Sequence, residues 1–293
     1  MNVEDVLEAD WDAVGQLRDP VLVVALRGYF DIAGAATGAL EWCLDDREVT
    51  VVASIDPDPF FDFTSQRPEV YLDEDEQRKI IWPENEIVVV RFPDGARDLV
   101  VLSGVEPHFN WNIFAECIVQ GAQRLNCSIA VTIGAFDESI PHTRTPNVFG
   151  STSNAALARR MKLSLPKYEG PTGLVGVLHE RFEREHLPSV SLRVGVPRYL
   201  LNAQHPKSSA ALLRHLELVL GVPTRHAELY EEIRRWSELH DAAVEGDEQI
   251  SNYVQILERD FDQRSQVQLP SAEDLGAELE QFLREQPDED SDK

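Results

Sequence analysis

The sequence predicts an α/β fold with a mainly parallel sheet, and two features of its hydrophobic pattern carry this prediction. Continuous apolar runs rich in β-branched residues occur at 21–26, 49–55, 98–103, 128–133 and 189–196. Such runs are typical of strands that are covered on both faces, as in parallel sheets. Helical patterns lie between them, at 34–44, 110–125, 151–161 and 174–186. Alternating strands and helices indicate a sheet whose faces are covered by helices.

The strand patterns stop near residue 203. Beyond that point, apolar residues recur at helical spacing in four segments, which are 206–220, 225–244, 248–264 and 272–284. A switch from alternating elements to helices alone marks a boundary. We therefore expect a core domain at 1–203, a helical lid at 204–284 and a disordered acidic tail at 285–293, because EQPDEDSDK has no apolar period.

Composition excludes several classes of protein. The chain has 293 residues, of which 43% are hydrophobic, so it has enough apolar surface for a full core. Its 27 basic and 52 acidic residues give a net charge of -25, which argues against a nucleic-acid partner. No apolar run approaches the ~20 residues of a membrane span. The start MNVEDVLEADWDAV lacks the features of a signal peptide, so we expect a cytoplasmic protein.

Motifs of catalysis and metal binding are missing from the sequence. Cys43, Cys117 and Cys127 fall in apolar patterns without metal-ligand spacing, which indicates buried hydrophobes. The chain has no G-x-S-x-G, H-E-x-x-H, P-loop or G-x-G-x-x-G motif. His179 and His186 are seven residues apart, a poor spacing for one metal on a helix. We therefore assign no catalytic residue, metal or cofactor. The missing motifs favour a protein that is not an enzyme.

The segment 134–150, GAFDESIPHTRTPNVFG, is the strongest candidate for a binding loop. It follows a predicted buried strand, and ligands of open α/β sheets collect beyond the carboxyl ends of strands. His142, Thr143 and Arg144 offer a titratable ring, a hydroxyl and a cationic fork. Together they suit an anion or a carbonyl group. The alternative is that His142 and Arg144 tie down the loop by binding backbone carbonyls.

Other polar and aromatic residues lie at the same predicted edge. Glu106 follows the strand at 98–103, and Trp111 begins the next helix beside it. Glu106 would act as a base with a raised pKa or, as the favoured alternative, pair with Arg144.

The remaining candidates come from three further loops. Arg27 ends the first strand, and Asp31 lies at the mouth of the first helix, where it suits an N-cap. Thr172 belongs to a stiff turn before another helix, whose free amides favour an anion. Tyr199 follows the last strand and offers a stacking wall.

A β-hairpin is predicted as an insertion at about 67–92. Short β-type runs at 69–72 and 79–82 flank the acidic turn 73–76. A projecting hairpin has no core in which to bury its apolar side chains, so we expect them to contact another subunit. These side chains are Tyr71, Ile80, Ile81 and Trp82.

Several motifs together resemble the actinobacterial branch of the proteasome assembly chaperone family. In order, they are GYFDIAG, SIDPD, LSGVEPHFNW, PHTRT, YEGPTG, VPRYL, HPKSSAALLRHLE and NYVQILE, from about residue 21 to 258. The resemblance implies an α/β/α sandwich, like the core of nucleoside phosphorylases and related hydrolases without their catalytic residues. It also implies a hairpin used in oligomer contacts, a trimer, and a C-terminal helical lid over a ligand site.

The chain departs from this family at three points. Relatives that assist proteasomes end in a hydrophobic-Tyr-any signature, whereas this chain ends in DSDK, so docking by its tail is not expected. The usual P-H-T-R-P reads P-H-T-R-T-P here, and Tyr29 replaces the usual Trp of the first turn. The polar residues of both motifs are kept.

The first functional hypothesis is a non-catalytic protein that binds a small ligand, such as an anion, or a protein client in the crevice under the lid. The expected lining is Arg27, Asp31, Glu106, Trp111, His142, Thr143, Arg144, Thr172 and Tyr199. One alternative is a hydrolase or phosphorylase for a nucleoside-like or peptide-like substrate, with Glu106 or His142 as base and Arg144 stabilising charge. The other is an oligomeric scaffold without a ligand.

Overall fold

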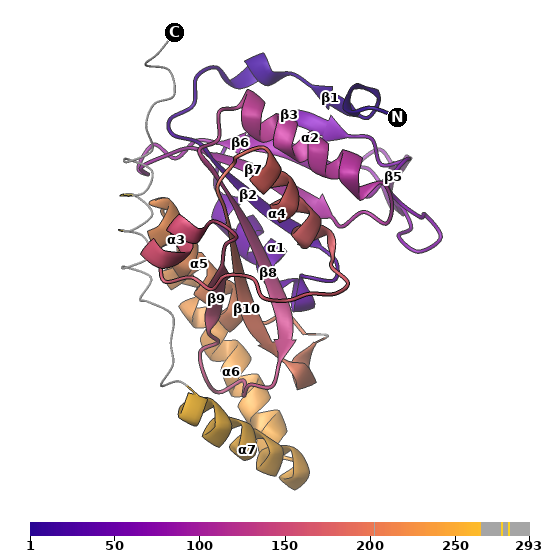
Figure 1. The fold of residues 1–293 in the computed structure, drawn as a ribbon. Coiled ribbons are helices and arrows are strands. Elements are labelled where there is room, and N and C mark those ends of the chain that lie inside the picture. Colours follow the sequence, from indigo (N-terminus) through magenta and orange to yellow (C-terminus); the bar gives the residue numbers. More distant parts are fainter. Residues whose placement is uncertain (202, 265–276, 278–280, 282–293) are drawn as a thin grey trace.

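An eight-stranded sheet forms the middle of the fold, in the order β1-β3-β6-β7-β2-β8-β10-β9 (Figure 1). The structure, a computed structural model, describes residues 1–201, 203–264, 277 and 281. The strands are β1 Leu7–Ala9, β2 Val21–Arg27, β3 Val49–Ile55, β6 Asn85–Val90, β7 Leu99–Val105, β8 Ile129–Glu138, β9 Val148–Ser151 and β10 Ser189–Pro197. The central strands β7, β2, β8 and β10 are parallel, and β1, β6 and β9 run against them. The predicted mainly parallel sheet is confirmed.

Helices cover both faces of this sheet. The helices α1 Ala35–Leu44, α3 Ala155–Arg160 and α5 Pro206–Leu220 pack on one face, and α2 Trp111–Arg124 and α4 Leu174–Arg184 pack on the other. Successive residues of a strand point to opposite faces, so Val21 and Val23 join the first core cluster and Leu22 and Val24 the second. The predicted α/β/α sandwich is confirmed.

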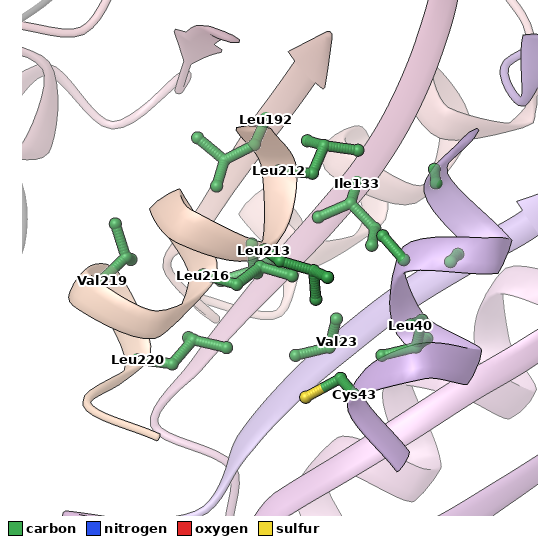
Figure 2. Packing of buried hydrophobic residues seen from close by; sticks show 14 of the residues in the cluster. Val23, Leu40, Cys43, Ile133, Leu192, Leu212, Leu213, Leu216, Val219 and Leu220 are labelled. Carbon is green, nitrogen blue, oxygen red and sulfur yellow. The ribbon is translucent and has the colours of Figure 1, made fainter. Parts of the chain in front are cut away.

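The structure differs from the expected boundary at residue 203 in one respect. Leu212, Leu213 and Leu216 of α5 are buried in the core cluster beside Val23 of β2 and Leu192 of β10 (Figure 2). This helix belongs to the core layer because its apolar stripe packs directly on the sheet.

Two predicted segments are shorter in the structure than expected. β8 continues to Glu138 and β9 begins at Val148, so the expected loop 134–150 is reduced to 139–147. β6 pairs with β3 and β7 in the main sheet, so only part of the predicted insertion 67–92 projects. The projecting part is the hairpin of β4 Glu69–Leu72 and β5 Arg78–Ile81.

Two helices lie beyond the carboxyl ends of β8 and β10, α6 Tyr230–Glu245 and α7 Glu248–Arg264 (Figure 1). Short 3-10 helices complete the described elements, at η1 Val3–Asp5, η2 Trp11–Val14, η3 Ile32–Gly34, η4 Arg198–Leu200 and η5 His226–Leu229. Most of the helix expected at 272–284 and all of the acidic tail 285–293 lie outside the described residues. Within the described part, no helix is long and apolar enough to cross a membrane.

Acid sensitivity follows from a partly buried histidine of α4. His179 Nε2 lies 2.8 Å from Thr132 Oγ1, and its Nδ1 lies 2.9 Å from Ser189 Oγ. Burial, with a smaller effect of the Arg193 charge, lowers its pKa from 6.5 to about 4. The unfolded chain therefore binds more protons between these pH values, so stability is complete above pH 6.5 and falls towards pH 4.

We predict that replacing His179 by Gln flattens this pH dependence. Between pH 7.5 and 4.5, the unfolding free energy of the wild-type chain should fall by about 2–3 kcal/mol more than that of His179→Gln. Urea titrations at the two pH values measure the difference. Equal losses in the two proteins would contradict the assignment.

Candidate ligand pocket

The candidate site lies where the loops after β8 and β10 meet α6 and α7. Because β8 and β10 are parallel neighbours, their carboxyl ends share one edge of the sheet. His142 comes from the loop after β8, and Tyr199 comes from η4, directly after β10. Both residues were expected at this edge, because each follows a predicted strand.

His142 is the buried centre of the site, with 1% of its surface exposed. Its backbone N–H donates to the Tyr199 hydroxyl at 2.7 Å, and its Nδ1 lies 2.6 Å from the same oxygen. Its Nε2 lies 3.1 Å from Asp241 Oδ1 on α6. Since the hydroxyl accepts from the backbone, its own proton is free to go to Nδ1, and Nε2–H then donates to Asp241. One residue thus joins both core loops to α6.

Burial keeps the two central groups uncharged. It lowers the pKa of His142, although Asp241 partly opposes this shift. It also raises the pKa of Tyr199 to about 12. Both groups therefore act as neutral hydrogen-bonding partners near pH 7.

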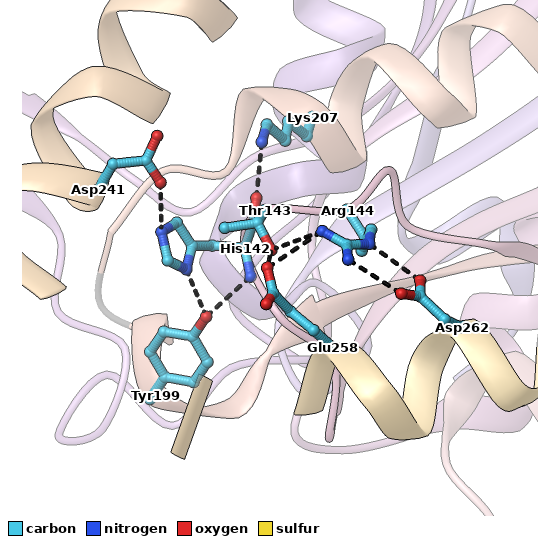
Figure 3. Close-up of polar contacts among 8 residues, drawn as sticks. All are labelled: His142, Thr143, Arg144, Tyr199, Lys207, Asp241, Glu258 and Asp262. Carbon is cyan, nitrogen blue, oxygen red and sulfur yellow. Dashed lines mark hydrogen bonds and ion pairs between the residues drawn. The ribbon is translucent and has the colours of Figure 1, made fainter. Parts of the chain in front are cut away.

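Thr143 and Arg144 bind α7 (Figure 3). Thr143 Oγ1 donates to Glu258 Oε1 at 2.5 Å. The Arg144 guanidinium donates to both carboxylate oxygens of Asp262 at 2.9 Å and to Glu258 Oε1 at 3.1 Å. Glu258 and Asp262 are four residues apart, so they lie on one face of the helix. The Arg144 guanidinium was expected to bind an external anion. In the structure, carboxylates of the chain itself bind it instead.

Further contacts fix the beginning of α5 and the middle of α6. Lys207 Nζ donates to the His142 carbonyl oxygen at 2.6 Å. Trp236 Nε1 donates to the Gln204 carbonyl at 2.8 Å, and its ring stacks on His240 with centroids 4.0 Å apart. These contacts hold the inner face of α6 against the sheet edge.

A cavity of about 360 Å³ lies between the sheet edge and the two helices. Its lining is His142, Tyr199, Leu200, His240, Ala243, Val244, Gln249, Ile250 and Tyr253. Carbon-rich side chains from η4, α6 and α7 form most of this wall. Such a largely apolar hollow with a few polar groups is typical of small-molecule pockets.

The other expected site residues lie elsewhere. Asp31 is buried and caps α1, because its carboxylate accepts from the Ala36 N–H at 2.8 Å and the Thr37 hydroxyl at 2.5 Å. Arg27 Nη1 lies 3.8 Å from Glu41 on α1. The structure thus gives Asp31 the capping role that its position suggested.

Glu106 and Arg144 have different partners, so their expected pairing is wrong. Glu106 Oε2 accepts the Tyr29 N–H at 2.9 Å. Trp111 Nε1 donates to the Pro107 carbonyl at 2.6 Å, and Thr172 is exposed before α4. None of these three residues lines the 360 Å³ cavity.

Sequence reasoning missed the residues that the helices supply, namely Asp241, His240, Tyr253, Glu258 and Asp262. The four-residue spacing of Glu258 and Asp262 was an available signal, since it predicts a carboxylate pair on one helix face. In the part of the chain that the structure describes, no three His, Cys, Asp or Glu side chains gather to hold a metal ion.

We predict that Arg144→Ala loosens α7 from the core. Amide hydrogen exchange in 248–264 should become a few-fold faster, the scale expected for partly exposed ion pairs. Arg234→Ala is the matched control, because Arg234 pairs with Glu231 and Glu238 of its own helix. If both variants changed exchange in α7 equally, the anchoring role of Arg144 would be refuted.

Comparisons with known proteins agree with this fold. The sequence model of the PAC2 family matches residues 25–244. A comparison with curated proteins found no match.

Three solved structures illustrate the similarity. A PAC2 family protein from Streptomyces avermitilis is 38% identical, with a TM-score of 0.74, and the match covers 80% of this chain and 100% of that one. A Mycobacterium tuberculosis protein described as a proteasome-assembly chaperone homologue is 31% identical, with a TM-score of 0.72 and coverages of 80% and 99%. A second protein from that organism, of unknown function, is 25% identical, with a TM-score of 0.79 and coverages of 95% and 96%. The chain therefore belongs to the PAC2 family, which confirms the relationship to proteasome assembly chaperones expected from its motifs.

Proposed function

We propose that this protein is a non-catalytic binding protein, and that the cavity between the sheet edge and α6–α7 takes the apolar part of a small molecule. The cavity itself carries the proposal, since about 360 Å³ of space is bordered mainly by aliphatic and aromatic side chains. The transfer of an apolar group from water into such a site is favourable by a free energy of about 0.8 kcal/mol per CH₂.

Three polar groups of the lining are available to orient the ligand. His240 Nδ1 lies 2.8 Å from the Trp236 carbonyl, which leaves Nε2 for a ligand. The Tyr253 hydroxyl and the Gln249 side-chain amide also line the cavity. Among the described residues, none of these three groups has a hydrogen-bond partner. The ligand that fits is a mostly apolar molecule with one hydrogen-bonding group.

The protonation states support binding rather than catalysis. Both ring nitrogens of His142 already have partners, and the high pKa of Tyr199 keeps its phenol protonated. Burial raises the pKa of the Cys43 and Cys117 thiols to about 11 and 12, so neither thiol is activated. The relative described as a proteasome-assembly chaperone homologue supports the same class of function.

The cytoplasmic location expected from the sequence belongs to this proposal. Cys43, Cys117 and Cys127 are free thiols. Unpaired thiols fit a reducing compartment.

The binding of straight-chain alcohols tests whether the cavity takes an apolar ligand. We predict that affinity rises about fourfold for each added CH₂ until the chain fills the cavity, as the transfer free energy requires. Ala243→Phe should abolish this binding, because Ala243 lines the cavity, whereas Ala242→Phe on the exposed side of α6 should not. Isothermal titration calorimetry with alcohols of increasing length measures both effects. Affinity independent of chain length, or equal effects of the two variants, would refute the proposal.

The β4–β5 hairpin supports a second part of the proposal, a homo-oligomer for which a trimer is our expectation. Its exposed side chains include Tyr71 at 47%, Ile80 at 55%, Ile81 at 48% and Trp82 at 40%. An apolar surface of this kind on a projecting hairpin suits contact with another subunit.

We predict that Ile81→Asp dissociates this oligomer, because the contact would bury an unpaired charge. The native mass spectrum of the wild-type protein should show a trimer, and that of the variant a monomer. Leu239→Asp is the control, since Leu239 is 69% exposed on α6, away from the hairpin. A monomeric wild-type protein would contradict the prediction.

A further inference from the structure

Among the residues that the structure describes, no helix covers one face of the outer strand β3. The strands β3, β6 and β7 have α2 on one face, where Val52, Ile87 and Val100 are buried. On the other face, α1 packs over β2 and β8, and Val88 of β6 and Val101 of β7 are buried in the same core cluster, so only β3 extends beyond it. Val49 and Val51 of β3 are 43% and 48% exposed there. A sandwich of this type normally covers such a face with a helix.

Strand register places one set of side chains on this open face. Val51 is opposite Val88, and Val88 is opposite Val101. Glu86 lies opposite Ser54 on one side and Ser103 on the other. The face is therefore apolar towards Val49 and acidic towards Glu86.

A groove of about 310 Å³ runs between this face and α1. Its lining is Glu41, Leu44, Asp45, Val49, Glu86, Val88, Val101 and Ser103. Glu41 has an exposed contact with Arg27 at 3.8 Å. Among the described residues, Asp45 and Glu86 have no cationic partner within salt-bridge distance. The lining thus combines an apolar floor with carboxylates that lack counter-charges.

We propose that this groove binds an amphipathic helix of a protein partner, with apolar side chains on one stripe and Lys or Arg beside it. The apolar lining that reaches solvent is Val49 of β3 and the half-buried Leu44 of α1. Val49 and Leu44 contact the apolar stripe, and Asp45 and Glu86 pair with the flanking cations. The partner completes the helical layer that α1 and α5 begin.

Charge favours a foreign partner over this chain as the occupant. The segment 265–293 has nine acidic and two basic residues, so carboxylates of the groove repel it. A second copy has the same net charge of -25. A partner with basic residues is instead attracted to the carboxylates of the groove.

The test uses an 18-residue fluorescent peptide with leucines on one helical face and lysines on the other, added to the full chain at physiological salt. Its anisotropy should show saturable binding, and hydrogen exchange should slow in 49–55 and 86–90. Val51→Lys and Glu86→Gln should each weaken binding about tenfold. Leu239→Lys and Glu183→Gln make the same changes at exposed positions elsewhere and should leave binding within twofold.

Three outcomes would overturn the proposal. Equal weakening by the groove and control variants would show attraction to the net charge alone. Absence of saturable binding, with the variants folded by circular dichroism, would show that the groove takes no such helix. Dissociation of a wild-type oligomer by Val51→Lys would identify a second copy as the occupant.

Discussion

Hydrogen bonds from the short segment 141–144 hold the α6–α7 helices against the carboxyl edge of the sheet, and the pocket depends on them. His142 binds Tyr199 of the core and Asp241 of α6, while Thr143 and Arg144 bind Glu258 and Asp262 of α7. The cavity has core residues on one wall and helix residues on the other. It therefore exists only while these contacts position the helices.

These contacts differ in strength because they differ in burial. The His142 ring is almost inaccessible to water, so losing one of its partners would leave a buried polar atom unsatisfied. The Arg144 and Asp262 side chains are 35% and 56% exposed, and solvent screens their attraction. His142 thus makes the most buried of these contacts, to Tyr199 and to Asp241 of α6. Arg144 mainly aligns α7, and its carboxylate partners keep external anions from its guanidinium.

Sequence patterns predicted the layers, most strands and helices, and the placement of His142 and Tyr199, because parallel neighbours end at the same edge. They did not predict strand order. β2 lies between β7 and β8, so Glu106 follows a strand two positions from β8. Since β8 also extends to Glu138, His142 lies further beyond the sheet, and the expected Glu106–Arg144 pair does not form. The docking of α6 and α7 depends on distant side chains, which helical spacing alone does not reveal.

The role of His142 in positioning the helices is tested most directly by measuring the distance between the core and α7 in solution. Glu183 on α4 and Asn252 on α7 are exposed positions for spin labels. Pulsed electron paramagnetic resonance then measures the distance between the two labels. If His142 positions the helices, the otherwise wild-type chain should give one narrow distance distribution and His142→Ala a broad one. A distribution that stays equally narrow after His142→Ala would contradict the central role of His142.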